Sequence, residues 1–147
     1  MSRISLLDVN VLVALFDPDH VHHELAHDWF TEQRRHGWST CPITENGLIR
    51  VLSNPAYSPV AERPGQVLKR LATFCRSGHH VFWPDLVSLR DPKIVRAPLA
   101  ATHRQITDLY LLALAVRRDG CLATFDRHVP RSAVGGAGVE HIVVVGA

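Results

Sequence analysis

The chain has 147 residues, of which 46% are hydrophobic and 20% are charged, a composition typical of a globular protein rather than a disordered one. No apolar run approaches the ~18 residues that cross a bilayer, and an acid at position 8 comes too early for a secretory signal. The net charge of +2 is too small to establish a nucleic-acid partner. An odd number of cysteines without C-x-x-C spacing argues against a disulfide framework or a thiolate zinc site and favours the cytoplasm. The length predicts a single domain over 1–147.

Strands and helices are predicted to alternate along the chain. Continuous apolar runs such as Ile4–Leu7 are typical of strands buried in a parallel sheet. In chain order we predict a strand over 4–7, helices over 9–16 and 21–36, a strand over 38–41, a helix that starts at Pro42, a helix over 64–76, a strand over 80–83, a helix from a Thr107 cap to about Arg118, and strands over 121–125 and 141–145. The stretch 85–102 reads as a short helix and a loop. This alternation indicates βαβ units and a mostly parallel sheet.

Four carboxylates fall where such a sheet would bring them together. Asp8 and Asp126 each follow a predicted strand, and Glu45 and Asp108 each begin an apolar helical segment. Sites in parallel sheets form at the carboxyl ends of the strands, where the following helices also begin. Taken singly, each acid fits an ordinary turn or first-turn position. Taken together, the four predict a shared site.

A site built from four carboxylates needs a cation. Like charges at close range raise one another's pKa unless a cation neutralises them. Mg²⁺ and Mn²⁺ prefer oxygen ligands, so one or two such ions would let all four acids stay ionised. We therefore predict a metal-dependent active site.

The surroundings of these acids resemble a known family. The matching stretches are Leu6–Val13, the isolated Glu45, Ile106–Ala115 and Ala123–Asp126, with the patterns L-D-x-N, T-D-x-Y-L and T-F-D. They resemble the PIN-domain nucleases and, among these, the VapC toxins of bacterial toxin–antitoxin pairs. The resemblance runs from Leu6 to about Val145 and is weakest over 55–98.

The resemblance implies a three-layer α/β/α sandwich around a mostly parallel sheet of four or five strands. It also implies an endoribonuclease that depends on Mg²⁺ or Mn²⁺ and hydrolyses RNA with a water that the metal activates. Its partners would be a VapB-type antitoxin and a second copy of the chain. The residues that match the family's catalytic, metal-binding acids are Asp8, Glu45, Asp108 and Asp126. Asn10 and Thr124 match its supporting polar positions, although a capping or turn role fits both equally well.

Arginines are candidates for binding RNA phosphate. Arginine accounts for 14 of the 16 basic residues, and its planar fork suits phosphate, although a GC-rich genome would give the same bias. Arg127 is the best placed because it follows Asp126, and Arg50, Arg104 and Arg131 are further candidates. Surface arginines without this role are the ordinary alternative.

Other functions deserve comparison with the nuclease. The segment His23-Glu24-Leu25-Ala26-His27 matches the H-E-x-x-H pattern of zinc proteases, but Asp28 follows it directly and no third ligand is evident. A catalytically silent PIN-fold module for binding or assembly is another alternative. A phosphotransfer receiver or phosphatase would need a lysine at a strand end, and neither Lys69 nor Lys93 is so placed.

Overall fold

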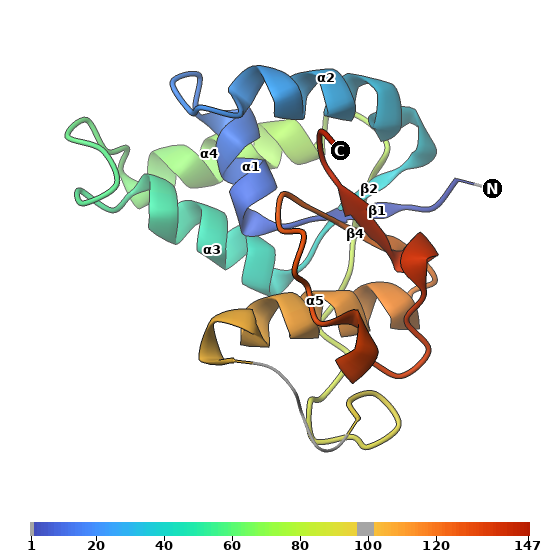
Figure 1. Ribbon diagram of the computed structural model, residues 1–147. Coiled ribbons are helices and arrows are strands. Elements are labelled where there is room, and N and C mark those ends of the chain that lie inside the picture. Colours follow the sequence, from blue (N-terminus) through green and yellow to red (C-terminus); the bar gives the residue numbers. More distant parts are fainter. Residues whose placement is uncertain (1, 97–101) are drawn as a thin grey trace.

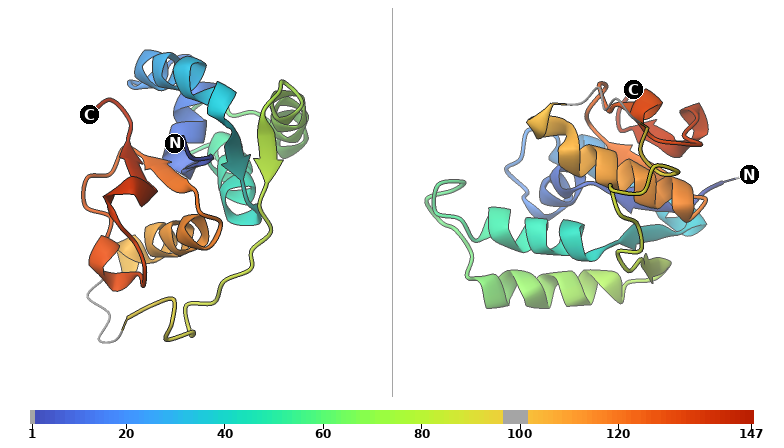
Figure 2. Two further views of the ribbon diagram at one scale, coloured as in Figure 1. Left: turned by 90° about the vertical axis from the view of Figure 1, so that its right-hand side faces the viewer. Right: turned by 90° about the horizontal axis from the view of Figure 1, so that it is seen from below.

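The computed structural model describes residues 2–96 and 102–147, and its centre is a five-stranded sheet. The strand order is β3-β2-β1-β4-β5, and every neighbouring pair is parallel. Figure 2 shows β3 and β5 at the two edges of the sheet. The strands are β1 (Ser5–Leu7), β2 (Trp38–Thr40), β3 (His80–Phe82), β4 (Cys121–Thr124) and β5 (Ile142–Val144).

Helices cover both faces of this sheet (Figure 1). Alternate strand residues face opposite sides, so Leu7 and Ala123 pack into one hydrophobic core while Leu6 and Leu122 pack into another. The first core is covered by α1 (Val9–Phe16), α2 (His23–Gln33), α3 (Pro42–Leu52) and α4 (Pro64–Cys75), and the second by α5 (Ile106–Arg117). The predicted three-layer sandwich with a parallel sheet is confirmed.

The register of the sheet places the first candidate acid beside β4. Leu7 of β1 pairs with Ala123 of β4, and the next backbone N–H, that of Asp8, donates to the Ala123 carbonyl at 3.0 Å. Asp8 is therefore the residue where β1 ends and α1 begins. The matching residue on β4 is Thr124, the last of that strand.

Helix α3 packs closely against α1. Its first turn is fixed by Pro42 at the first helical position and by Thr44, whose Oγ1 accepts the backbone N–H of Cys41 at 2.9 Å. A methyl group at Gly47 would lie 2.6 Å from a Val9 methyl carbon, a distance that real structures do not allow. The missing side chain therefore lets the two helices approach, and it brings the start of α3 near the end of β1.

Several predicted boundaries differ from the structure. The predicted Thr107 cap is wrong, because a 3-10 turn over His103–Gln105 runs directly into α5, which begins at Ile106. The helix predicted over 21–36 divides into α2 and a 3-10 turn over Arg34–His36, and the predicted strands are each shortened at one or both ends.

The short helix predicted within 85–102 is absent from its described part, 85–96. This stretch instead runs along α5, where Val95 forms an isolated antiparallel bridge with Val134 and is buried in the second core. Backbone hydrogen bonds with the 133–135 segment replace those of a helix: Arg96 N–H donates to Ala133 at 2.9 Å. Residues 97–101 of this prediction lie outside the described residues. Within the described residues, no helix has the length and apolar character needed to cross a bilayer.

Candidate active site

Asp8 is the most deeply buried acid at the carboxyl end of the sheet. Only 5% of the residue is exposed, and Thr124 Oγ1 donates a hydrogen bond of 3.0 Å to its Oδ2. Burial raises the pKa of Asp8, the Thr124 hydrogen bond and the first backbone amides of α1 lower it less, and the charge of Asp126 raises it further. A carboxylate in this position needs a nearby positive charge to stay ionised.

Asp126 and Asp108 lie close to Asp8. The backbone N–H of Asp126 donates to Thr124 Oγ1 at 3.1 Å, so one hydroxyl connects the segments that carry Asp8 and Asp126. Asp108 enters from the first turn of α5. Burial raises the pKa of Asp108 to about 7, helped by the charges of Asp8 and Asp126 and by a hydrogen bond with Asp126. The three carboxyls therefore share one electrostatic environment.

These three residues, which we call the aspartate cluster (Asp8, Asp108 and Asp126), offer carboxylate oxygens to a divalent metal ion. In the described part of the chain they are not a group whose ligand atoms all lie within 4.8 Å of one another, so their side chains would have to move to hold an ion together. No ion pair of the described residues joins any of them to a lysine, arginine or histidine. The pKa values of Asp8 and Asp108 are raised, and a bound cation would lower them by favouring the ionised carboxylates. Because all the side-chain donors are carboxylate oxygens, the set suits a hard ion such as Mg²⁺ or Mn²⁺.

Glu45 lies in the first turn of α3, but its carboxylate has different neighbours. Thr40 Oγ1 donates to Glu45 Oε2 at 2.7 Å, and Thr40 Oγ1 also lies 2.8 Å from His80 Nε2. None of the side-chain hydrogen bonds of the described residues joins Glu45 to the aspartate cluster. Three of the four predicted acids are therefore brought together, and the metal-binding role of Glu45 stays a prediction.

The sequence did not indicate the residues around Glu45. Ligand atoms of Glu45, Cys75 and His80 all lie within 4.8 Å of one another, and this is the only such group of three or more found in the described part of the chain. The absence of C-x-x-C spacing had argued against a thiolate ligand. The available signal was weak: Ser39 and Thr40 place hydroxyl groups in two of the three positions of a buried strand.

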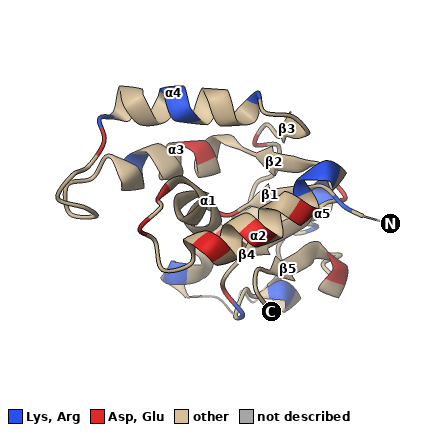
Figure 3. Cartoon of the chain, turned by 90° about the horizontal axis from the view of Figure 1, so that it is seen from above, with Lys and Arg blue, Asp and Glu red and all other residues tan. Residues whose placement is uncertain are grey.

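The predicted supporting and RNA-binding residues are exposed, with one exception. Thr124 is fully buried between the acids, whereas Asn10 is exposed on α1. Arg127 lines, with Arg131, a surface hollow of about 430 Å³ next to the segment after Asp126. The remaining candidates, Arg50 and Arg104, are exposed on α3 and on the turn before α5. Basic residues lie on separate elements in Figure 3, whereas acidic residues follow the length of α2.

The H-E-x-x-H segment does not form a zinc site in the structure. His23 and His27 do meet edge to face at the start of α2, with ring centroids 4.5 Å apart. However, His23 Nδ1 is hydrogen-bonded to the Ala14 carbonyl at 2.7 Å, and no third ligand residue joins the pair among the described residues. The pattern is therefore explained by helix packing.

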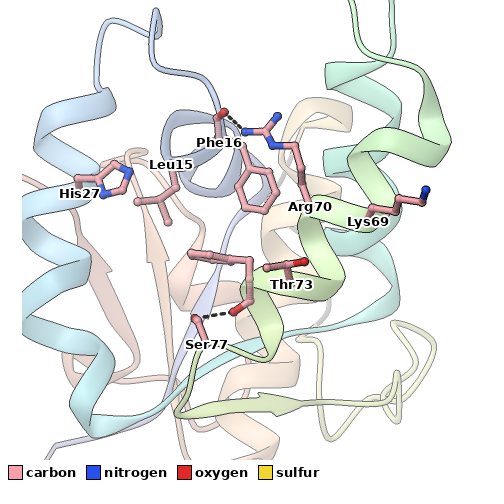
Figure 4. A pocket seen from close by; sticks show the side chains of 8 residues that line it. Leu15, Phe16, His27, Lys69, Arg70, Thr73 and Ser77 are labelled. Atoms are coloured by element: carbon pink, nitrogen blue, oxygen red, sulfur yellow. Dashed lines mark hydrogen bonds between the residues drawn. The ribbon is translucent and has the colours of Figure 1, made fainter.

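A separate groove lies between α1, α2 and α4 and has a volume of about 470 Å³. Its floor is apolar, and the Phe16 ring lies beneath the Arg70 guanidinium, whose carbon is 5.0 Å from the ring centroid (Figure 4). Arg70 also donates to the Phe16 carbonyl and pairs with Glu62. The groove shares no residue with the aspartate cluster. Its lining residues are Leu15, Phe16, His27, Lys69, Arg70, Thr73, Phe74 and Ser77.

Comparisons with known proteins agree with this geometry. The PIN domain family model matches residues 5–134. Ribonuclease VapC44 of Mycobacterium tuberculosis is 45% identical over 142 residues, which cover 96% of this chain and 99% of that protein. Ribonuclease VapC39 of the same organism is 43% identical over 132 residues, which cover 90% and 95% of the two chains. Ribonuclease VapC38 is 44% identical over 126 residues, which cover 86% and 87%. The chain therefore belongs to the PIN-domain family and, within it, to the VapC ribonucleases.

Proposed function

We propose that this VapC-type chain is a single-domain, Mg²⁺- or Mn²⁺-dependent endoribonuclease and the toxin of a toxin–antitoxin pair in the cytoplasm. The observation that carries the proposal is the aspartate cluster, in which Asp8, Asp108 and Asp126 meet at the carboxyl edge of the sheet without a protein cation. Relatives named as ribonucleases match 96% and 90% of this chain.

The protein's part in catalysis would be to hold and orient the acids. Asp8, Asp108 and Asp126 would bind one or two ions, and Glu45 would join them if its side chain turned away from Thr40. A bound ion would supply a Lewis acid that stabilises charge on the scissile phosphate and makes water a better nucleophile at neutral pH. The Thr124 hydroxyl would keep two of the acids in place, since it donates to Asp8 and accepts from the backbone of Asp126.

The proposed substrate and partners follow from charge and from the family. RNA would approach over Arg127 and Arg131, which flank the hollow beside Asp126, because phosphate contacts supply most of the affinity for nucleic acid. Three exposed acids lie four residues apart along α2 and would repel RNA from that helix: Glu24, Asp28 and Glu32. A VapB-type antitoxin and a second copy of the chain are the protein partners that we propose from family membership.

The test is cleavage of end-labelled total RNA in Mn²⁺ by antitoxin-free protein. Wild type is compared with Asp8→Asn, which removes one charge of the cluster, and with Asp19→Asn, which removes an exposed charge elsewhere. We expect discrete fragments from wild type and Asp19→Asn and none from Asp8→Asn.

Three results would count against the proposal in different ways. Equal cleavage by Asp8→Asn would remove the aspartate cluster from the reaction. No fragments from protein that binds Mn²⁺ would favour a binding module. Fragments that persist in excess EDTA would contradict the dependence on a metal.

A further inference from the structure

A second group of metal-binding side chains surrounds Glu45. Its members come from three elements: Glu45 from α3, Cys75 from the end of α4 and His80 from β3. All three are partly buried, and their ligand atoms lie within 4.8 Å of one another. Between Cys75 and His80 the chain reverses through two residues with positive φ, Gly78 at 114° and His79 at 66°. This turn returns β3 alongside the end of α4.

Thr40 and Trp38 hold the group in place from β2. Thr40 is fully buried and donates its only hydroxyl proton to Glu45 Oε2 at 2.7 Å. His80 Nε2 lies 2.8 Å from Thr40 Oγ1, and because that hydroxyl gives its proton to Glu45, the ring nitrogen is the donor of this hydrogen bond. The His80 ring packs on Trp38 with centroids 4.6 Å apart. The imidazole is thus fixed before any ligand arrives.

The donor set suits a different metal from the one at the aspartate cluster. Zinc takes thiolate, imidazole and carboxylate ligands in tetrahedral sites, where donor atoms are about 3.5 Å apart. The three donors here need only small side-chain movements to reach that spacing, and a fourth position would be left for water. Mg²⁺ and Mn²⁺ favour sites made of oxygen alone, so they would compete poorly for the sulfur and nitrogen donors.

Binding requires the thiol to lose its proton. Burial raises the pKa of Cys75 to about 11, helped by the charge of Glu45, so the group is a neutral thiol in the metal-free protein. On binding, the sulfur lone pair forms the bond to the metal and the thiol proton passes to solvent, with no change of oxidation state.

We propose that Glu45, Cys75 and His80 form an inhibitory site for Zn²⁺ or a similar thiophilic divalent ion. Glu45 is shared, because it is also the fourth acid expected to complete the aspartate cluster. A Zn²⁺ ion bound here holds the Glu45 carboxylate beside Cys75 and keeps it from the Mg²⁺ or Mn²⁺ site. The inhibitory part rests on the proposed nuclease function, whereas the metal site does not.

Cobalt spectroscopy tests the site without reference to activity. Metal-free full-length protein is titrated with Co²⁺, which gives an intense near-ultraviolet charge-transfer band when a thiolate binds it. We expect the band in wild type and its loss in Cys75→Ser, with at least ~10-fold weaker Co²⁺ affinity in His80→Gln. The matched controls are Cys121→Ser, a buried cysteine on β4, and His79→Asn, the exposed neighbouring imidazole; both should keep the band. No band in wild type, or a band that survives Cys75→Ser, would overturn the site.

RNA cleavage in Mn²⁺ with added Zn²⁺ tests the inhibition. Zn²⁺ should inhibit wild type and Cys121→Ser, whereas Cys75→Ser should need at least ~10-fold more Zn²⁺ for the same loss. Equal Zn²⁺ sensitivity of Cys75→Ser and wild type would overturn the link to Glu45. If no variant cleaves RNA under any condition, the nuclease proposal fails, and the cobalt spectrum still decides the metal site.

Discussion

Burial of the Asp108 carboxylate, together with its repulsion by Asp8 and Asp126, should destabilise the metal-free protein, and Asp108→Asn measures by how much. The pKa of Asp108 is about 7 against an ordinary 3.8, which at about 1.4 kcal/mol per pH unit sets an upper bound near 4 kcal/mol. Because the side chain is only half-buried, solvent screening reduces this to about 1–2 kcal/mol. Asp108→Asn removes this penalty, so the variant should be more stable than wild type. In a chain of this length, that difference should raise its Tm by about 3–6 °C at pH 8.

The pH dependence gives the prediction its sign. Above pH 7, folded Asp108 is charged and the full penalty applies; as the pH falls from about 7 toward 4, the folded protein takes up a proton before the unfolded chain does and becomes more stable. The variant lacks this gain, so the difference between the two proteins should be smaller at pH 5 than at pH 8 and should vanish below about pH 4.

Urea unfolding of EDTA-treated protein, followed by tryptophan fluorescence at pH 8 and pH 5, measures the effect. Asp28→Asn, an exposed change on α2, is the control and should leave the urea midpoint unchanged at both pH values. Added Mg²⁺ should stabilise wild type more than Asp108→Asn, because the variant has lost a ligand. A variant that is less stable at pH 8, or a gain of equal size at pH 5, would refute the reasoning.

Three other substitutions test the support of the site and the packing behind it. Thr124→Val removes the hydrogen bond to Asp8 and should lower RNA cleavage about 10- to 100-fold with the fold retained by circular dichroism; unchanged cleavage would show that the hydroxyl does not position the acid. Gly47→Ala places a methyl carbon 2.6 Å from Val9 and should destabilise the protein by about 1–3 kcal/mol in thermal unfolding. An unchanged Tm would show that α1 and α3 can move apart without loss of stability. Leu112→Ala, at a fully buried position of α5, should cost about 2–5 kcal/mol in urea unfolding, and a loss below about 1 kcal/mol would contradict the packing of the second core.

Local sequence determined the strand and helix order and the position of two acids. Apolar periodicity depends on residues within a few positions of one another, which is why the runs at β1 and β4 and the helix that carries Asp108 could be predicted. Because parallel strands end at a common edge, the acids that follow β1 and β4 had to meet there. Asp8 and Asp126 duly share Thr124 as a hydrogen-bonding partner.

Element boundaries and the path of 85–96 depended on distant partners. The end of the 85–96 stretch is tied to a distant segment, because Arg96 N–H donates to the Ala133 carbonyl and the Ile94 carbonyl accepts from Gly135. The 3-10 turn over His103–Gln105 likewise displaced the expected Thr107 cap. Local patterns carry little information about such pairings between segments that lie far apart in the sequence.

The neighbours of Glu45 show most clearly what the sequence alone could not determine. Its place in the first turn of α3 and on a partly buried face followed from helical periodicity, but its partner did not. Thr40 and His80 are 40 positions apart, and they meet only because β2 and β3 pair in register after the α4–β3 turn reverses through Gly78 and His79. A carboxylate binds whichever donor the folded chain brings within about 3 Å. The sequence therefore determined the acids and the sheet edge that they occupy, whereas the tertiary structure decided which side chains each acid contacts.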